Sequence, residues 1–302
     1  MDTQLTQQSN SPEKSSAASV DEADAPLLSW SRSDIEQRLG FHGARHTRVN
    51  NLVSFLAAIL ATAAFYAGLL YLGDSYLAVM FRERGPTPYF IVFLSMWSLA
   101  ILFFKWRKLA LQRSSLSISV LPPVHDFVLS PTTVDEVTRR LYQVTDDPKH
   151  FILFNRIQIA LSNLKNLGRV SDVDEILRSQ AETDEGAMDT SYSLLRGFIW
   201  AIPVLGFIGT VLGLSDAIGA FGGVLGSSSD MEAVTASLRQ VTSGLATAFE
   251  TTLEALVAAL TIQLMATFLR KSEEEFLDDA REYCNRNVVS RLRMTPFDRL
   301  AD

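Results

Sequence analysis

The stretch IPVLGFIGTVLGL, Ile202–Leu214, decides the fold, because it is apolar enough to cross a membrane and yet unusually rich in small residues. On a helical wheel, one face about 80° wide gathers the small and hydroxyl residues Pro203, Gly206, Thr210, Gly213 and Ala217. Small residues let two membrane helices approach closely, which is how such helices associate without a hydrophobic driving force. We therefore expect Pro203, Gly206, Gly209 and Gly213 to serve helix packing along one seam.

Three other segments are also apolar enough to cross a bilayer, for which a helix needs roughly 20 residues. The four expected spans are Leu52–Leu72, Pro88–Phe104, Gly197–Ile218 and Leu245–Leu269. No strand-like alternation of apolar and polar residues occurs between them. The sequence therefore predicts an all-α integral membrane protein with four transmembrane helices, a helical cytoplasmic insertion and long cytoplasmic helix extensions.

Basic residues set the orientation of membrane helices, because they accumulate on the cytoplasmic side. In this chain basic residues precede the first span, follow the second, lead into the third and follow the fourth. These are the sides on which both termini and residues 105–196 lie. The residues are Arg32, Arg38, Arg45, Arg48, Lys105, Arg107, Lys108, Arg113, Arg196, Arg270, Lys271, Arg281 and Arg286. We interpret Lys105 to Lys108 as an interfacial stop after the second span. Both termini and the insertion are thus expected in the cytoplasm, and the chain in a bacterial inner membrane.

The polar segments divide the chain into five expected regions. Residues 1–28 are Ser-rich and polar and are interpreted as a disordered cytoplasmic tail, followed by the first two spans in residues 29–104. Residues 105–196 form the insertion, residues 197–269 the last two spans, and residues 270–302 a cytoplasmic C-terminal helix. That last helix continues the fourth span through one apolar face: Phe276, Leu277, Ala280, Cys284, Val288 and Leu292.

Cap and proline signals predict three helices in the insertion. Ser130 with Pro131 is expected to begin the first, and Pro148 to Leu167, stopped by Gly168, to form the second. Ser171 with Asp174 is expected to cap a third, which ends at about Glu185.

Several classes of function are excluded by composition. The net charge is −7 and no Lys/Arg tract alternates with aromatic residues, which argues against nucleic acid as a partner. The chain has one cysteine, no His-Glu-x-x-His motif, and its four histidines lie outside the expected spans. An intramembrane protease is therefore not supported, and we expect no catalytic residue, no metal site and no cofactor other than a permeant ion.

The fourth span has a small-residue face of its own: Ala248, Thr251, Thr252, Ala255, Ala258 and Ala259. Leu253, Leu256, Leu260 and Leu264 point the opposite way, toward lipid or an apolar neighbour. A third flank, about 200° round from Thr252, holds Thr247, Glu250, Glu254 and Thr261. Two helices with small faces and threonines near mid-membrane predict a narrow polar lining.

These two spans resemble the paired signature of the MotA/TolQ/ExbB proton-channel family over roughly residues 150–270. The resemblance rests on IPVLGFIGTVLGL and, about thirty residues later, GLATAFETTLEALVAAL. The arrangement Pro-x-x-Gly-x-x-Gly-Thr-Val-x-Gly is similar to that of the TolQ/ExbB branch, whereas four spans is the number in MotA. Where some TolQ/ExbB-type members carry an acidic residue early in the last span, this chain has Thr247.

The resemblance implies a subunit of an ion channel and stator complex. In that family, five copies of the channel subunit form a homo-oligomer around an ExbD/TolR/MotB-like single-span partner, which carries an intramembrane aspartate. Ion flow drives movement of the ring of channel subunits relative to the partner. It further implies that Thr210 and Thr252 line the pore opposite that aspartate. Whether H⁺ or Na⁺ permeates, and which process the complex drives, stay open.

Three alternatives remain at this point. Thr210 either lines the pore or bonds its own backbone one turn back. Glu250 and Glu254 either relay the permeating cation, with Thr247 beside them, or are neutral or ion-paired residues that fix helix packing. The whole protein is either a conducting motor subunit or a non-conducting oligomeric scaffold in the bilayer.

Overall fold

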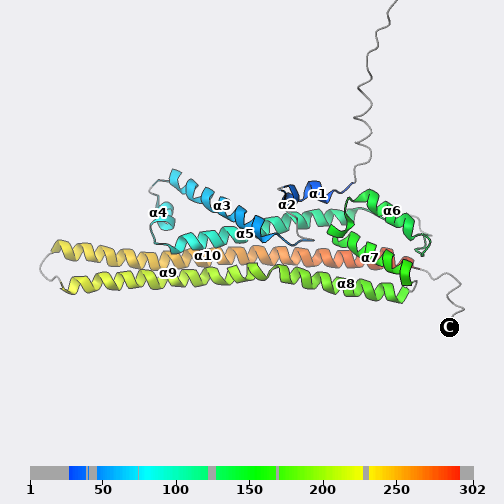
Figure 1. The fold of residues 1–302 in the computed structure, drawn as a ribbon. Helices are drawn as coiled ribbons and strands as arrows, with labels where there is room; N and C mark the ends of the chain where they lie inside the picture. Colours follow the sequence, from blue (N-terminus) through cyan, green and yellow to red (C-terminus); the bar gives the residue numbers. More distant parts are fainter. Residues whose placement is uncertain are drawn as a thin grey trace, which may run out of the picture.

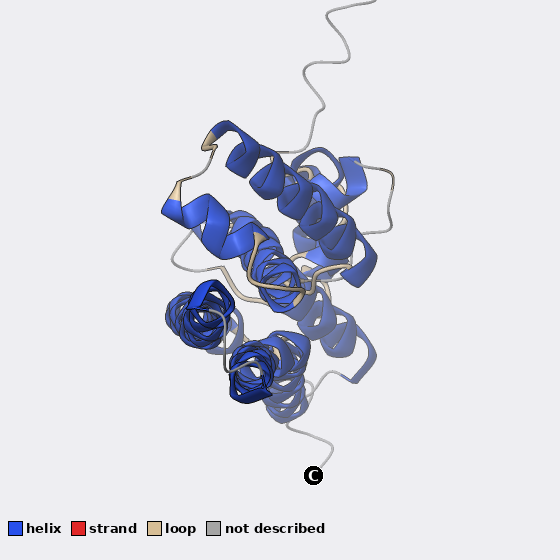
Figure 2. Cartoon of the chain, turned by 90° about the vertical axis from the view of Figure 1, so that its left-hand side faces the viewer, coloured by secondary structure: helices blue, strands red, loops and turns tan. Residues whose placement is uncertain are grey.

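A computed structural model of the 302-residue chain describes residues 27–38, 40, 46–73, 75–121, 127–167, 170–226 and 231–292. Within these ranges the regular elements are helices, and no strand occurs. The long helices run side by side as an elongated bundle (Figure 1), and a view turned by 90° shows several of them nearly end-on (Figure 2). The expected all-α architecture is confirmed.

Four of the described helices are long and apolar enough to cross a membrane. They are α3 (Asn51–Tyr71), α5 (Thr87–Ser114), α9 (Ser193–Gly226) and α10 (Met231–Tyr283). Each contains most or all of one expected span, but α5, α9 and α10 continue well beyond theirs. The chain is thus a multi-pass membrane protein whose last two helices project far out of any bilayer.

The short helix α4 (Tyr76–Arg82) connects α3 to α5 and lies near the end of the bundle at which α9 turns into α10 (Figure 1). We call this the turn end. The helices α6 (Val134–Val144), α7 (Ile152–Leu167) and α8 (Val170–Ser191) lie toward the opposite end, the insertion end (Figure 1). Two short helices, α1 (Trp30–Ser33) and α2 (Ile35–Arg38), also pack there.

The extension of α10 is held by the insertion. Its predicted apolar face is buried throughout, with Phe276 and Ala280 at 0% exposure and Cys284 at 2%. Ala280, Cys284, Val288 and Leu292 of this face belong to a core that also contains Trp30 and residues of α6, α7 and α8. Phe276 and Leu277 pack in a second core with residues of α5, α8 and α9. The end of α10 and the turns after it thus supply one wall of the core of the insertion.

The starts of all three insertion helices were predicted wrongly. The segment expected to be helical from Pro148 begins with a 3₁₀ turn, Pro148–His150, and α7 begins only at Ile152. Pro131 lies in a turn, and α6 begins only at Val134 after Thr133, which makes no side-chain cap. Ser171 lies inside α8, which begins at Val170 and runs to Ser191, beyond the expected end near Glu185. This helix extends further than its local cap signals predict, because it packs against α10 and leads almost directly into α9. The expected stop at Gly168 lies outside the described residues.

The interpretation of Lys105 and Lys108 as an interfacial stop is also wrong. Lys105 is 1% exposed and its Nζ lies 3.2 Å from Oε2 of Glu273 in α10. Lys108 is 3% exposed and its Nζ lies 2.6 Å from Oε2 of Glu36. Both ammonium groups are thus buried in ion pairs that join α5 to α10 and to α2, and they fix the packing at the insertion end.

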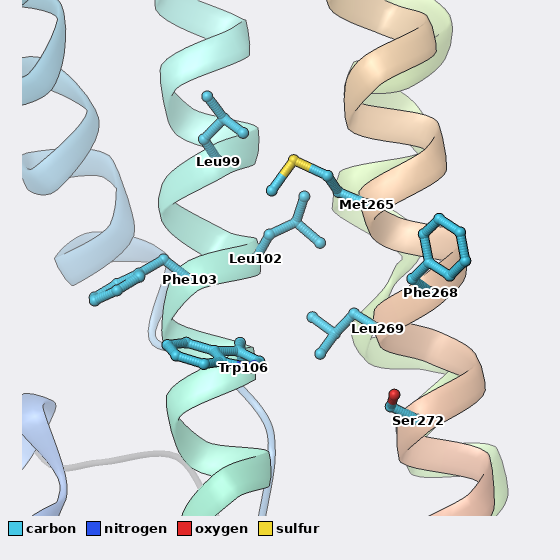
Figure 3. A pocket seen from close by; sticks show the side chains of 8 residues that line it. All are labelled: Leu99, Leu102, Phe103, Trp106, Met265, Phe268, Leu269 and Ser272. Carbon is cyan, nitrogen blue, oxygen red and sulfur yellow. The ribbon is translucent and has the colours of Figure 1, made fainter.

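The packing of α5 against α10 leaves one apolar cavity of about 430 Å³ (Figure 3). Side chains from the two helices face each other across it, and Ser272 provides its single hydroxyl: Leu99, Leu102, Phe103, Trp106, Met265, Phe268, Leu269 and Ser272 line it. Because this lining is almost wholly apolar, the cavity suits hydrocarbon rather than an ion.

The two ends of the chain are described only in part. The expected disordered tail, residues 1–28, lies outside the described residues except for Leu27 and Leu28. Residues 293–302 of the expected C-terminal helix also lie outside them. Within the described part, α10 ends at Tyr283 and is followed by a π-helical turn, Cys284–Val288, and a 3₁₀ turn, Val289–Arg291.

Candidate functional site

The small-residue face of α9 lies against α10 of the same chain. A Cβ atom added to Gly206 would lie 2.5 Å from Cβ of Ala255, and one added to Gly209 would lie 2.5 Å from Oγ1 of Thr251. A Cβ atom on Gly213 would lie 2.6 Å from the carbonyl oxygen of Gly244. No side chain fits at these distances, so the glycines are what allow the two helices to come this close.

Thr210 and Thr252 meet across this seam. Their hydroxyl oxygens contact each other, and each hydroxyl also lies within hydrogen-bond distance of the same two carbonyl oxygens. Oγ1 of Thr210 is 3.2 Å from the carbonyls of Gly206 and Ala248, and Oγ1 of Thr252 is 3.1 Å from both. The result is a cluster of four oxygen atoms, two from each helix, which we call the threonine cluster.

The threonine cluster has more acceptor capacity than protons. A threonine hydroxyl carries one O–H donor and two lone pairs, and a carbonyl carries two lone pairs. Each carbonyl already accepts the backbone N–H four residues later in its own helix, so each keeps one lone pair for the two hydroxyl protons of the cluster. Lone pairs of the hydroxyl oxygens remain for a water molecule, a hydronium ion or a desolvated cation. Both threonines are half-buried, so the cluster lies at the border of the seam rather than sealed inside it.

Each threonine bonds both its own backbone and the facing helix. The backbone bond expected for Thr210 as one alternative is present, and its oxygen also contacts α10. That Thr210 lines a pore stays a prediction.

Two other candidate residues, Pro203 and Thr247, are not part of the threonine cluster. Pro203 lies inside α9, where it provides no backbone N–H, and is half-buried. The Thr247 hydroxyl donates to the Ser243 carbonyl at 3.0 Å on its own helix.

Thr251 was not predicted to have a role in the site. It is nevertheless 1% exposed, and its hydroxyl fills the space left by Gly209. Its place on the small face of α10 was the signal available.

Glu250 lies away from the threonine cluster and is bound by arginine. Nε of Arg84 is 2.7 Å from Oε2 of Glu250, and Nη2 is 3.2 Å from Oε1. The Tyr76 hydroxyl also donates to Oε1, at 3.1 Å. A two-point arginine contact of this kind is among the strongest polar interactions in proteins. Glu250 thus anchors the α4–α5 connection to α10.

Glu254 follows one turn later and has a different environment. Its side chain is 8% exposed, and neither carboxyl oxygen has a hydrogen-bond partner in the described part of the chain. Tyr66 of α3 interacts with it electrostatically. The structure therefore brings Thr210 and Thr252 together and separates both from Glu250 and Glu254.

No metal centre accompanies these groups. Among the described residues, no set of three or more His, Cys, Asp or Glu side chains is close enough to hold a metal ion. In the described part of the chain, the polar groups of the threonine cluster and of Glu254 are hydroxyls, carbonyls and a carboxyl, which are groups that bind and pass protons or alkali cations.

Comparison with known proteins agrees with this geometry. Residues 145–282 match the family model described as the MotA/TolQ/ExbB proton channel family. The matched segment begins at the end of α6 and includes α7, α8, α9 and nearly all of α10, so it contains the whole threonine cluster. No curated protein and no solved structure gave a match.

Proposed function

Because the chain belongs, through residues 145–282, to the MotA/TolQ/ExbB proton channel family, we propose that it is the channel subunit of an ion-driven stator complex. In this proposal the subunit couples the ion-motive force to mechanical work through a single-span partner protein. The threonine cluster is the observation that carries the proposal. It is a neutral, oxygen-rich group within the membrane-spanning part of the matched segment.

We assign the ion pathway to Thr210 and Thr252. A pathway for H⁺ or Na⁺ needs oxygen atoms that replace part of the ion's hydration and release it again. The four oxygens of the cluster meet this need without a fixed charge, which would hold a cation too tightly. A carboxylate supplied by a partner helix would provide the charge, and the hydroxyls would take part in its protonation or ion exchange.

The proposed assembly is a homo-oligomer around the partner. Large apolar side chains of α9 and α10 are exposed in the single chain, among them Trp200 at 75% and Phe249 at 71%. Such surface is covered either by lipid or by neighbouring copies, and the family resemblance favours a pentamer. One elementary charge that crosses 100 mV releases about 2.3 kcal/mol, which is enough to bias a small rotation of a partner between equivalent subunits.

The proposed location is a bacterial inner membrane with both termini and the insertion end in the cytoplasm. The basic residues at the insertion end support this orientation. The turn end, which carries α4 and the α9–α10 connection, would then face the opposite side of the membrane.

Ion flux tests the proposal directly. The full chain, co-purified with the single-span protein encoded beside it, is placed in liposomes that contain a pH-sensitive dye. Thr210→Val and Thr252→Val keep the side-chain shape but remove the hydroxyl, and we expect either change to lower flux about tenfold or more, since a lost hydrogen bond to a charged group costs about 1.5–3 kcal/mol.

Thr261→Val is the matched control, because its hydroxyl donates only to the carbonyl of Val257 on its own exposed helix face, at 2.8 Å. Its flux should equal that of the wild type. A wild-type complex that passes neither H⁺ nor Na⁺ would instead support the alternative, a non-conducting oligomeric scaffold.

A further inference from the structure

A group of polar atoms is buried on the side of α10 that faces away from the threonine cluster. Both carboxyl oxygens of Glu254 are inaccessible to solvent and lack a hydrogen-bond partner among the described residues. The same is true of the Tyr66 hydroxyl and, one turn earlier on the same face of α3, of the Thr62 hydroxyl. Glu254 and Tyr66, which interact electrostatically, therefore both keep unused hydrogen-bonding capacity in the membrane-spanning part of two helices.

The position of Glu254 makes an ionised carboxylate costly. Glu254 lies about 14 Å along the helix from Leu245, at 1.5 Å per residue, and so near the middle of the expected span. A charged side chain at the centre of a bilayer costs about 2.5–3.5 kcal/mol, and an unpaired buried charge costs more in the interior of a protein. A proton on the carboxyl removes this cost.

Glu250 provides the contrast on the same helix. It is the same residue type one turn earlier, but its carboxylate binds Arg84 through two nitrogens and accepts from Tyr76. The two carboxyl groups therefore differ in what they contact: Glu250 has a cation beside it, and Glu254 has no hydrogen-bond partner in the described part of the chain.

The other groups around Glu254 do not offer it a positive charge. Tyr66 faces it from α3, and Tyr89 of α5 stacks on Tyr66 with ring centroids 4.7 Å apart. Arg84, from the α4–α5 connection, is engaged by Glu250. In the described part of the chain, no cation thus pairs with the Glu254 carboxyl.

From this geometry we propose that Glu254 is a proton-binding site, separate from the threonine cluster, with Tyr66 as the hydroxyl that faces it from α3. The ligand is a proton, held by the buried carboxyl group of Glu254, which has no ion-pair partner in the described part of the chain. This site goes beyond the proposed ion pathway and does not depend on it, because a buried protonated carboxyl exists whether or not the protein conducts.

A protonated carboxyl in an apolar site has a specific reaction with dicyclohexylcarbodiimide. The acid proton moves to a carbodiimide nitrogen while a carboxyl oxygen bonds to the central carbon. Migration of the acyl group from oxygen to nitrogen then gives a stable N-acylurea. The reaction is an addition with no leaving group, so the modified peptide gains the mass of one reagent molecule.

The experiment treats the purified full chain in detergent micelles with this carbodiimide at several pH values and maps the modified peptides by mass spectrometry. In the wild type we expect modification at Glu254, at least about tenfold above that at Glu250 and decreasing as pH rises. Glu254→Gln should abolish it and Glu250→Gln should retain it. Equal modification of both residues, or none at Glu254, would overturn the proposal.

Infrared spectroscopy gives a second readout that does not depend on access of the reagent. The wild type and Glu250→Gln should show a carbonyl band of a protonated carboxyl that is missing from Glu254→Gln, and Tyr66→Phe should shift this band. A spectrum without such a difference contradicts the site. Sodium that suppresses the modification at constant pH would overturn the proton assignment, since a carboxylate that binds sodium cannot also hold the proton.

Discussion

Gly213 of α9 and Gly244 of α10 face each other so closely that neither tolerates a side chain. A Cβ atom on Gly213 would lie 2.6 Å from the carbonyl oxygen of Gly244, and one on Gly244 would lie 2.7 Å from that of Gly213. The contact is reciprocal and involves backbone on both sides, so a rotamer change cannot relieve it. The whole seam that positions Thr210 and Thr252 depends on such contacts.

Gly213→Ala and Gly244→Ala should each destabilise the protein by about 1–3 kcal/mol, because the added methyl group forces α9 and α10 apart. Unfolding in a series of detergent mixtures, followed by circular dichroism, measures the change. Gly219→Ala is the control on the same helix, since nothing lies within 4 Å of a Cβ atom there. Equal effects of all three substitutions would show that the close approach is not limiting.

The bond between Arg84 and Glu250 should be worth more than an exposed ion pair. The two side chains are 16% and 12% exposed and share two contacts, so we expect a coupling of about 1–3 kcal/mol. A double-mutant cycle with Arg84→Ala and Glu250→Gln, read by detergent unfolding, measures it. Tyr76→Phe removes only the third contact and should cost about 0.5–1.5 kcal/mol. Additive single effects would contradict the pairing.

The buried pair of Lys105 and Glu273 should be sensitive to loss of one partner. Glu273 also accepts from the hydroxyls of Tyr192, at 2.8 Å, and Thr47, so Lys105→Met leaves its carboxylate buried without a cation. We expect a loss of about 3–5 kcal/mol, and a partial recovery when Glu273→Gln is added.

The exposed pair of Arg113 and Glu275, at 3.6 Å with side chains 47% and 55% exposed, provides the matched control on the same two helices. Arg113→Ala should change stability by less than about 1 kcal/mol. The measurement is thermal unfolding in micelles, and a similar loss at both sites would show that burial does not decide the outcome.

Attachment of α1 should depend on pH through Asp146. Burial acts to raise the pKa of Asp146, but its carboxylate accepts from the Trp30 amide, at 2.9 Å, and from Ser29 and Ser31, and these bonds outweigh burial and lower the pKa. A lowered pKa in the folded state means that this contribution is present above the unfolded value, about 3.9, and is lost as pH falls through the folded value.

Trp30 reports on this contact, because it is 1% exposed. In a variant whose other three tryptophans are replaced by Phe, acrylamide quenching of Trp30 should increase as the pH is lowered below about 4. Asp146→Asn should make the quenching independent of pH in this range. A wild-type protein with no such transition would show that the carboxylate does not hold α1.

The sequence predicted the parts of the site that follow from periodicity. The small residues of IPVLGFIGTVLGL share one helix face, and so do Ala248, Thr251 and Ala255, which meet them in the structure. Leu253 and Leu260 were expected on the outer side of α10, and they are 60% and 62% exposed in the single chain. A helix wheel carries this information because each face of a helix is fixed by the order of its residues.

The sequence alone determined that four apolar runs become membrane helices, although the third contains Asp216 and the fourth contains Glu250 and Glu254. It also determined that the last two helices have threonine-bearing faces of small residues. The length and spacing of apolar residues fix both properties. Only the tertiary structure decided which interaction partner each charged side chain has. Glu250 and Glu254 are equivalent on the wheel, yet Arg84, distant by 166 positions, reaches one and not the other. Likewise the sequence suggests that Lys105 lies at the membrane surface, whereas in the structure its ammonium group is paired with Glu273. Such pairings depend on how the helices pack against one another, which the spacing of residues along a single helix does not determine.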